Sequence, residues 1–199
     1  MNGSLFIITG ESGSGKSTLV SNAIMGGVGK RILTCTTRAP RENNGIMERD
    51  GVDYYFLSVE TFLNKLANKE FAEHALVYGN HYGTLIRNIQ ETRQESPVAF
   101  LIIDIQGAKT LMRDFEDAWS IFIHVEKAEM EERLRARGDT PDAIQRRLLK
   151  YDGEESMSTL CKEMLINTNG NLKKVSRRFI ALVELYRSID VATSMFGKT

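Results

Sequence analysis

A glycine-rich segment near the N-terminus constrains this chain more than any other feature. Residues 10–17 read Gly-Glu-Ser-Gly-Ser-Gly-Lys-Ser, between the apolar run of residues 5–9 and a segment that can continue as a helix. Glycine lets main-chain N–H groups wrap closely around an anion, because no Cβ stands in the way. A strand, this turn and a helix start together form a phosphate-binding loop, so we expect the chain to bind a nucleotide.

The side chains of this loop have separate predicted roles. Lys16 can reach the outer phosphates as a mobile cation, and the Ser17 hydroxyl is placed to bind a Mg²⁺ ion. A glycine-rich turn that carries Lys-Ser by chance is the alternative, and the flanking strand and helix patterns make it rare. The predicted ATP-binding residues are Gly10, Glu11, Ser12, Gly13, Ser14, Gly15, Lys16, Ser17 and Thr18.

Composition limits what surrounds this loop. The 199 residues are 42% hydrophobic, which suits one domain with a real core. Lys plus Arg equals Asp plus Glu at 26 each, so no net charge directs the chain to nucleic acid or membrane. No segment approaches the ~20 apolar residues of a membrane span. We therefore expect a cytoplasmic location, no nucleic-acid or membrane partner, and free thiols at Cys35 and Cys161.

Strand and helix patterns alternate along most of the chain, which predicts an α/β fold with a parallel sheet flanked by helices. The expected strands are residues 5–9, 31–33, 98–103, 121–125 and 164–167, and the expected helices are 16–25, 108–115, 127–137, 141–161 and 172–195. Residues 34–92 break this rhythm, with short strands at 52–57 and 71–78 around a helix at 59–68. This segment is interpreted as a small α+β lobe inserted between two strands of the main sheet.

Six further motifs stand in the order found in guanylate kinases, and the chain resembles that family over nearly its whole length. They read T-T-R-A-P-R at residues 36–41, E-x-x-G-x-D-Y at 48–54, F-A-E at 71–73, G-N-H-Y-G-T at 79–84, I-D-I-Q-G at 103–107 and R-L-R-A-R-G at 133–138. The resemblance implies a P-loop kinase three-layer fold in a single domain. Its core would be residues 1–33, 93–126 and 163–199, its GMP-binding lobe 34–92 and its lid about 127–150.

The resemblance also implies a reaction, the transfer of the γ-phosphate of ATP to GMP, and to dGMP, with Mg²⁺ (EC 2.7.4.8). The implied catalytic residues are Lys16, Arg38, Arg133, Arg137 and Arg147. The implied GMP-binding residues are Thr34, Arg38, Arg41, Tyr54, Glu73, Tyr82, Thr84 and Asp104, and the implied metal ligands are Ser17 and Asp104.

The chemistry of the residues is consistent with these roles. A nucleoside monophosphate has a second phosphate pKa near ~6, so it is already a dianionic nucleophile at neutral pH and needs no general base. Arginine is suited to neutralise the repulsion between two phosphates, because its planar fork binds phosphate through two hydrogen bonds. Guanine offers two donors on one edge, and a carboxylate such as Glu73 is their natural partner.

Other interpretations of the same residues stay open. Arg133 and Arg137 lie close to three glutamates and could form a salt-bridged helix face, and Asp104 could simply cap the following helix. A P-loop kinase with another acceptor and a catalytically silent binding module are the alternative functions. Two departures from the family pattern are Ile102, at the first of two usually acidic positions, and a loop at 42–53 that is about four residues longer. Monomer and homodimer are both compatible with the sequence.

Overall fold

The central element of the computed structural model is a parallel sheet with the strand order β11-β10-β1-β9-β2. The structure describes residues 2–43 and 45–196. The strands of this sheet are β1 (Ser4–Gly10), β2 (Lys30–Arg31), β9 (Val98–Ile102), β10 (Trp119–His124) and β11 (Glu163–Ile166). Because β1 is central and its carboxyl end leads into the glycine-rich segment, the sheet places that segment at one edge of the core.

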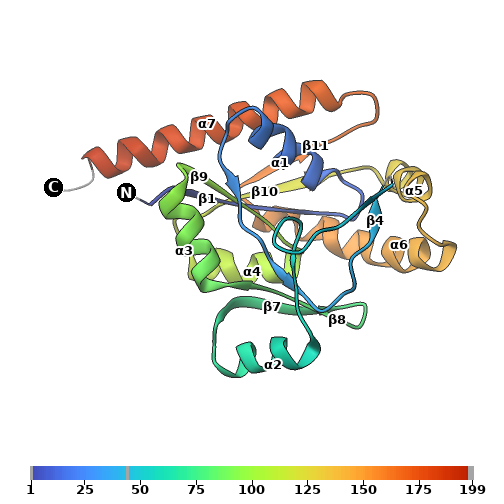
Figure 1. Ribbon diagram of the computed structural model, residues 1–199. Coiled ribbons are helices and arrows are strands. Elements are labelled where there is room, and N and C mark those ends of the chain that lie inside the picture. The colour runs from blue at the N-terminus through green and yellow to red at the C-terminus, as the bar shows by residue number, and fades with distance from the viewer. Residues whose placement is uncertain (1, 44, 197–199) are drawn as a thin grey trace.

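Helices cover both faces of this sheet, which gives the three layers (Figure 1). Alternate side chains of β1 point to opposite faces, as the pleat requires. Phe6 and Ile8 pack in the core under α1 (Lys16–Met25) and α7 (Leu172–Phe196). Leu5 and Ile7 pack in the other core, under α3 (Ile86–Glu95) and α4 (Ile105–Asp114).

A smaller lobe is inserted between β2 and β9. Its mixed sheet has the order β6-β3-β8-β7, and its strands are β3 (Cys35–Thr36), β6 (Tyr55–Phe56), β7 (Phe71–Val77) and β8 (Asn80–Leu85). Helix α2 (Val59–Ala67) covers this sheet through Phe62, whose ring stacks on Phe71 with centroids 4.4 Å apart. The long loop carries a two-stranded hairpin of β4 (Glu42–Asn43) and β5 (Ile46–Met47), with residue 44 outside the described residues.

A helical hairpin follows β10 and has its own apolar cluster. It consists of α5 (Lys127–Ala136) and α6 (Pro141–Ser156), and a 3₁₀ turn, η1 (Ser158–Leu160), follows it. Met130 and Leu134 of α5 pack against Ile144 and Tyr151 of α6. The side chain of Thr140 caps α6, and Pro141 occupies the first turn, where its missing N–H costs nothing.

The predicted α/β architecture with a parallel sheet is confirmed, and four details of the sequence interpretation are wrong. The strand expected at 52–57 is only β6, because a turn at Gly51, with a φ of 70°, precedes it. Helix α4 begins three residues early because the Asp104 side chain caps it. The helix expected to reach residue 161 ends at Ser156. Helix α3 and strands β3, β4, β5 and β8 were not predicted as elements at all.

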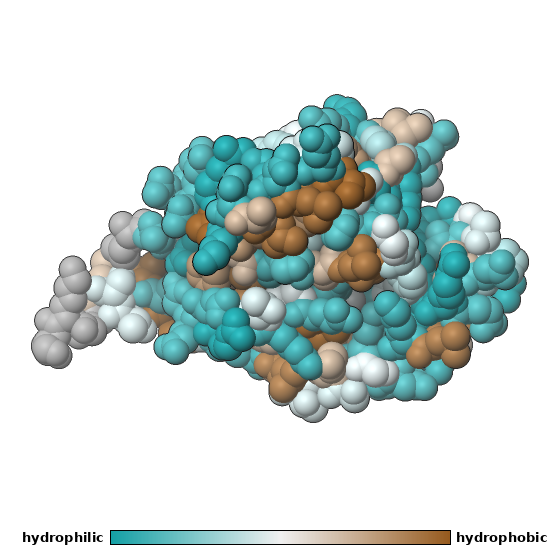
Figure 2. Space-filling view, turned by 90° about the horizontal axis from the view of Figure 1, so that it is seen from below, coloured by the Kyte–Doolittle hydropathy of each residue, from teal (hydrophilic) through white to brown (hydrophobic). Residues whose placement is uncertain are grey.

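One face of the molecule shows how its exposed apolar side chains are distributed. Seen from below the view of Figure 1, it is mostly hydrophilic, and hydrophobic side chains gather in separate patches (Figure 2). Leu63 of α2 and Leu76 of β7 are among the exposed apolar residues. In the described part of the chain, none of the helices has the length and apolarity that a membrane crossing requires.

Candidate active site

The phosphate-binding loop joins β1 to α1 and is shaped by glycines in backbone conformations that other residues rarely adopt. Gly10 has a φ of 136°, and a Cβ on it would lie 2.1 Å from the carbonyl oxygen of Ile123 in the neighbouring strand. Gly15 has a φ of 92° and directly precedes α1. A Cβ there would lie 2.5 Å from Nδ2 of Asn167, which donates a hydrogen bond to the Ser14 carbonyl at 2.7 Å. The loop is therefore fixed by its main chain and by the strands beside it.

Lys16 lies across its own loop. Its ammonium donates hydrogen bonds to the carbonyl oxygens of Gly10 and Glu11, each at 2.7 Å. Burial lowers the pKa of Lys16 to about 8. The side chains of Ser17 and Thr18 are exposed at the start of α1. To contact a phosphate, the Lys16 ammonium must exchange its two main-chain carbonyl acceptors for phosphate oxygens. These oxygens are negatively charged and bind the ammonium more strongly.

Two of the three predicted lid arginines reach this loop. Arg133 of α5 donates to the carbonyl oxygens of Gly13 at 3.2 Å and Asn167 at 2.6 Å. Arg147 of α6 donates to the Ser12 hydroxyl. Burial and the nearby Arg137 guanidinium lower the pKa of Arg147. Helices α5 and α6 thus bring two cations to the place where the loop would hold phosphates.

The third lid arginine lies further out. Arg137 is exposed and pairs with Asp139 in the turn between α5 and α6, where Nε of Arg137 lies 3.1 Å from Oδ1. Asp139 also lies 3.4 Å from Nε of Arg147, so this carboxylate connects the two arginines. The salt-bridged helix face considered from the sequence is present on α5, where Arg133 lies 3.2 Å from Glu129 and the exposed Arg135 lies 2.6 Å from Glu131.

Arg38 is the buried centre of the predicted acceptor region. Its guanidinium is 2.8 Å from Glu48 Oε2, donates from Nε to the Tyr82 hydroxyl at 3.2 Å, and lies 5.4 Å from the centre of the Tyr54 ring. The residue is 7% exposed, so the ion pair is largely withdrawn from water. The structure brings Arg38, Tyr54 and Tyr82 together.

Arg41 and Thr34 occupy different places in the lobe. The Arg41 side chain is exposed, while its main-chain N–H donates to Glu48 at 2.9 Å. Thr34 is buried immediately before β3, and its carbonyl accepts a hydrogen bond from the Tyr55 N–H at 2.9 Å. Neither contact brings these side chains to the Arg38 cluster.

Glu73 forms a second polar group in the lobe, deeper than Arg38. It is 6% exposed, and its Oε1 accepts a hydrogen bond from the Thr84 hydroxyl at 2.5 Å. Its other oxygen lies beside Gly107, where a Cβ would be only 2.6 Å away. Burial and the negative charge of Asp104 raise the pKa of Glu73 to about 7. Glu73 therefore presents a desolvated carboxylate that gains from a ligand with hydrogen-bond donors.

Asp104 serves as the helix cap that the sequence analysis left open. Its Oδ1 accepts from the N–H groups of Gln106 and Gly107, each at 2.9 Å. Ile102, at the position where the family pattern has an acidic residue, packs against the apolar core under α1 and α7. A carboxylate oxygen and the exposed Ser17 hydroxyl are the hard oxygen ligands that Mg²⁺ prefers. Among the residues that the structure describes, no three acidic, histidine or cysteine side chains gather as a metal site.

Sequence reasoning missed two residues that organise the site. Glu48 opens the motif at residues 48–54, and its pairing with Arg38 could have been inferred from that position. Asn167 bridges the phosphate-binding loop and Arg133. The only sequence signal for it was its position at the end of the strand predicted at residues 164–167. Both act through contacts between segments far apart in the chain.

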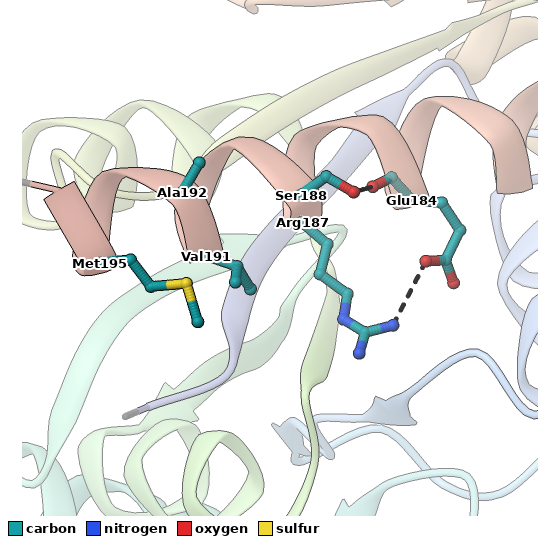
Figure 3. Close-up of a pocket in the computed structure, with 6 residues that line it drawn as sticks. All are labelled: Glu184, Arg187, Ser188, Val191, Ala192 and Met195. Atoms are coloured by element: carbon teal, nitrogen blue, oxygen red, sulfur yellow. Dashed lines mark hydrogen bonds and ion pairs between the residues drawn. The ribbon is translucent and has the colours of Figure 1, made fainter.

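Two cavities differ in their relation to this site. One of about 270 Å³ borders the loop and is lined by Gly13, Gly15, Thr18, Arg133, Asn167, Thr168, Asn169, Gly170 and Leu172. The other, of about 410 Å³, lies along the C-terminal half of α7 and is lined by Glu184, Arg187, Ser188, Val191, Ala192 and Met195 (Figure 3). The second contains none of the residues predicted to bind nucleotide.

Comparisons with known proteins agree with this geometry. A family model described as guanylate kinase matches residues 2–178. The guanylate kinase of Prochlorococcus marinus is 36% identical over 185 residues, covering 90% of this chain and 96% of that protein. The guanylate kinase of Fusobacterium nucleatum is 35% identical, with 92% and 96% covered. The crystal structure of guanylate kinase from Anaplasma phagocytophilum superposes with a TM-score of 0.71 at 27% identity, covering 94% of this chain and 87% of that one.

Proposed function

Because the chain belongs to the guanylate kinase family, we propose that its phosphate-binding loop and its lobe form one active site, in which ATP and GMP meet. The chain is an enzyme that phosphorylates GMP with ATP. The role of each residue, the bound metal and the range of acceptors are further parts of this proposal.

One observation carries the proposal. Arg147 donates a hydrogen bond to Ser12 in the loop, and its guanidinium also lies 5.6 Å from the centre of the Tyr78 ring, at the tip of the lobe. A single lid side chain therefore contacts both the region proposed to hold ATP and the region proposed to hold GMP. A cation at this junction is where a transferring phosphoryl group needs neutralisation.

On the donor side, the loop N–H groups and Lys16 would bind the phosphates of ATP, with Arg133 and Arg147 neutralising the charge that develops during transfer. Arg137 would support them through Asp139, which pairs with Arg137 and with Arg147. Ser17 and, through water, Asp104 would hold Mg²⁺. When bound, that ion would reduce the charge on the phosphates.

On the acceptor side, Arg38, Tyr54 and Tyr82 would bind the phosphate of GMP, with Arg41 approaching from the exposed side. Glu73 would accept the two guanine donors, and Thr34, Thr84 and Asp104 would complete the base site. Because the GMP phosphate is already a dianion near pH 7, positioning and charge neutralisation suffice for the reaction. No contact proposed here tests the ribose 2′-hydroxyl, so dGMP is a further proposed acceptor.

The experiment is to measure ADP formation by the purified protein from Mg·ATP with GMP, dGMP, AMP, UMP or no acceptor. We expect turnover with GMP and dGMP, and rates near the no-acceptor background with AMP and UMP. Equal rates with AMP and GMP would contradict the proposed base site. ADP formation that is independent of any acceptor would contradict the proposed joint active site.

The location, partners and oligomeric state of the enzyme are also proposals. We expect it to work in the cytoplasm on small-molecule substrates, without nucleic-acid or membrane partners, since its net charge is zero. Monomer and homodimer are distinguished by light scattering at assay concentration.

A further inference from the structure

The phosphate-binding loop contains a buried acidic side chain, although its proposed ligand is a polyanion. Glu11 is the second residue of the loop and is 0% exposed. Its Oε1 lies 2.9 Å from Nδ1 of His124. Its Oε2 is buried and has no hydrogen-bond partner among the residues that the structure describes. Burial raises the pKa of Glu11, whereas its hydrogen bond to His124 acts in the opposite direction.

His124 lies directly beneath the loop. It is the last residue of β10, the strand that pairs with β1 up to the register Gly10 and Ile123. Its side chain is 7% exposed, and its ring centre lies 6.2 Å from that of Tyr151 in the lid helix α6. Its Nε2 is 3.7 Å from the exposed carboxylate of Glu126. Glu11 is thus the buried partner of this imidazole and Glu126 the solvated one.

The pair is connected to the chemistry by the main chain. The carbonyl oxygen of Glu11 is one of the two acceptors that hold Lys16, at 2.7 Å. A displacement of the Glu11 side chain would therefore move a direct partner of Lys16. A buried carboxylate also repels phosphates, and the repulsion is strong because little water screens it. Both the position of Glu11 and its repulsion of phosphates depend on the His124 imidazole, which faces the Glu11 carboxylate.

We propose that His124 is a positioning residue for the donor nucleotide, whose imidazole holds the buried Glu11 carboxylate in place by a hydrogen bond beneath the phosphate-binding loop. The loop then accepts a polyphosphate in spite of its buried acid. This inference rests on the proposed binding of ATP by the loop, and titration of the unaltered protein with a non-hydrolysable ATP analogue tests that premise separately.

The test compares four variants by calorimetric titration with β,γ-imido ATP and by the KM for GMP. His124→Phe keeps the ring but has no donor, and we expect its Kd for the analogue to rise about tenfold or more, with the KM for GMP within about twofold. His124→Asn offers an amide near the Nδ1 position and should recover most of the affinity. Glu126→Gln is the matched control, since it removes the exposed carboxylate from the same imidazole, and should stay within about twofold.

The double variant Glu11→Gln/His124→Phe decides between pairing of the buried carboxylate and simple packing of the ring. With the carboxylate removed, no buried charge is left without its partner, so the double variant should bind the analogue about fivefold more tightly than His124→Phe. If it binds equally or more weakly, or if His124→Asn is as weak as His124→Phe, the proposal is wrong. Circular dichroism melts verify folding, and His124→Leu replaces His124→Phe, with the same expected results, if the latter does not fold.

Discussion

The proposed donor and acceptor regions of this protein hold their cations by different means. In the phosphate-binding loop, main-chain carbonyls of Gly10 and Glu11 hold Lys16. In the lobe, the carboxylate of Glu48 and the hydroxyl of Tyr82 hold Arg38. The first arrangement depends on backbone geometry within a few residues, and the second on side chains from separate strands. The hydrogen bonds of Lys16 are therefore local in sequence, whereas those of Arg38 depend on the packing of the whole lobe.

The largest effect is expected on the donor side. Lys16→Ala removes the cation proposed to contact the outer phosphates, and kcat/KM should fall by about 10³-fold or more. Steady-state kinetics with ATP and GMP measure it. Lys109→Ala, which removes an exposed lysine from α4, is the matched control and should stay near the unaltered rate. A loss of less than tenfold in Lys16→Ala would show that the lid arginines bind the phosphates without it.

The second largest expected effect changes the use of GMP without changing the binding of ATP. Glu73→Gln replaces the carboxylate with an amide that cannot accept both guanine donors without presenting its own N–H₂ group. We expect kcat/KM for GMP to fall about 10²-fold, with the KM for ATP unchanged. Rates with GMP and AMP measure the discrimination, and Glu91→Gln, on the exposed side of α3, is the control. Full discrimination in Glu73→Gln would remove this residue from the base site.

The pH dependence should also differ between the two regions. Burial and Asp104 raise the pKa of Glu73 to about 7, so its carboxyl is mostly neutral at pH 6 and mostly ionised at pH 8. Only the ionised form accepts both donors of guanine. The ratio of kcat/KM for GMP between the unaltered protein and Glu73→Gln should therefore rise about tenfold from pH 6 to pH 8. The ratio cancels the titration of the GMP phosphate itself, and a flat ratio would contradict this role.

The smallest effect concerns the buried partner of Arg38. Glu48→Gln removes the charge that orients this guanidinium, and we expect the KM for GMP to rise about fivefold, with a lower melting temperature. The KM for ATP should not change, because Lys16 is held by main-chain carbonyls and the lid arginines Arg133 and Arg147 by Asn167 and Ser12. A rise in both KM values would mean that the two regions are coupled through the lobe more strongly than their contacts indicate.

The contrast between local contacts and contacts across the fold also explains which features the sequence could predict. The strand β1, the glycine turn and α1 are determined by residues within one segment, and they were predicted with nearly their observed bounds. The turn before β6 and the early start of α4 were missed because a glycine with positive φ and acidic side chains, not hydrophobic periodicity, determine them. Asp50 accepts from the Phe56 N–H, and Asp104 caps α4. Hydrophobic patterns carry no information on such contacts.

The pairs that organise the site were less visible than its motifs. The resemblance to a family named Arg38 and Glu73, yet gave no account of their partners Glu48 and Thr84 in the folded chain. The Glu11 and His124 pair joins residues 113 positions apart, and nothing in either segment alone indicates the other. Contacts of this kind follow only from the register of β1 and β10, which the fold supplies.

The most direct test of the account is to follow the phosphate itself. Phosphorus NMR of Mg·ATP and GMP, incubated with a catalytic amount of protein, should show ADP and GDP appearing in equal amounts, with little free phosphate. This result would place donor and acceptor in one water-excluding site. Appearance of ADP and free phosphate without GDP would show that the loop hydrolyses ATP and that the lobe does not present GMP to it, which would contradict the account.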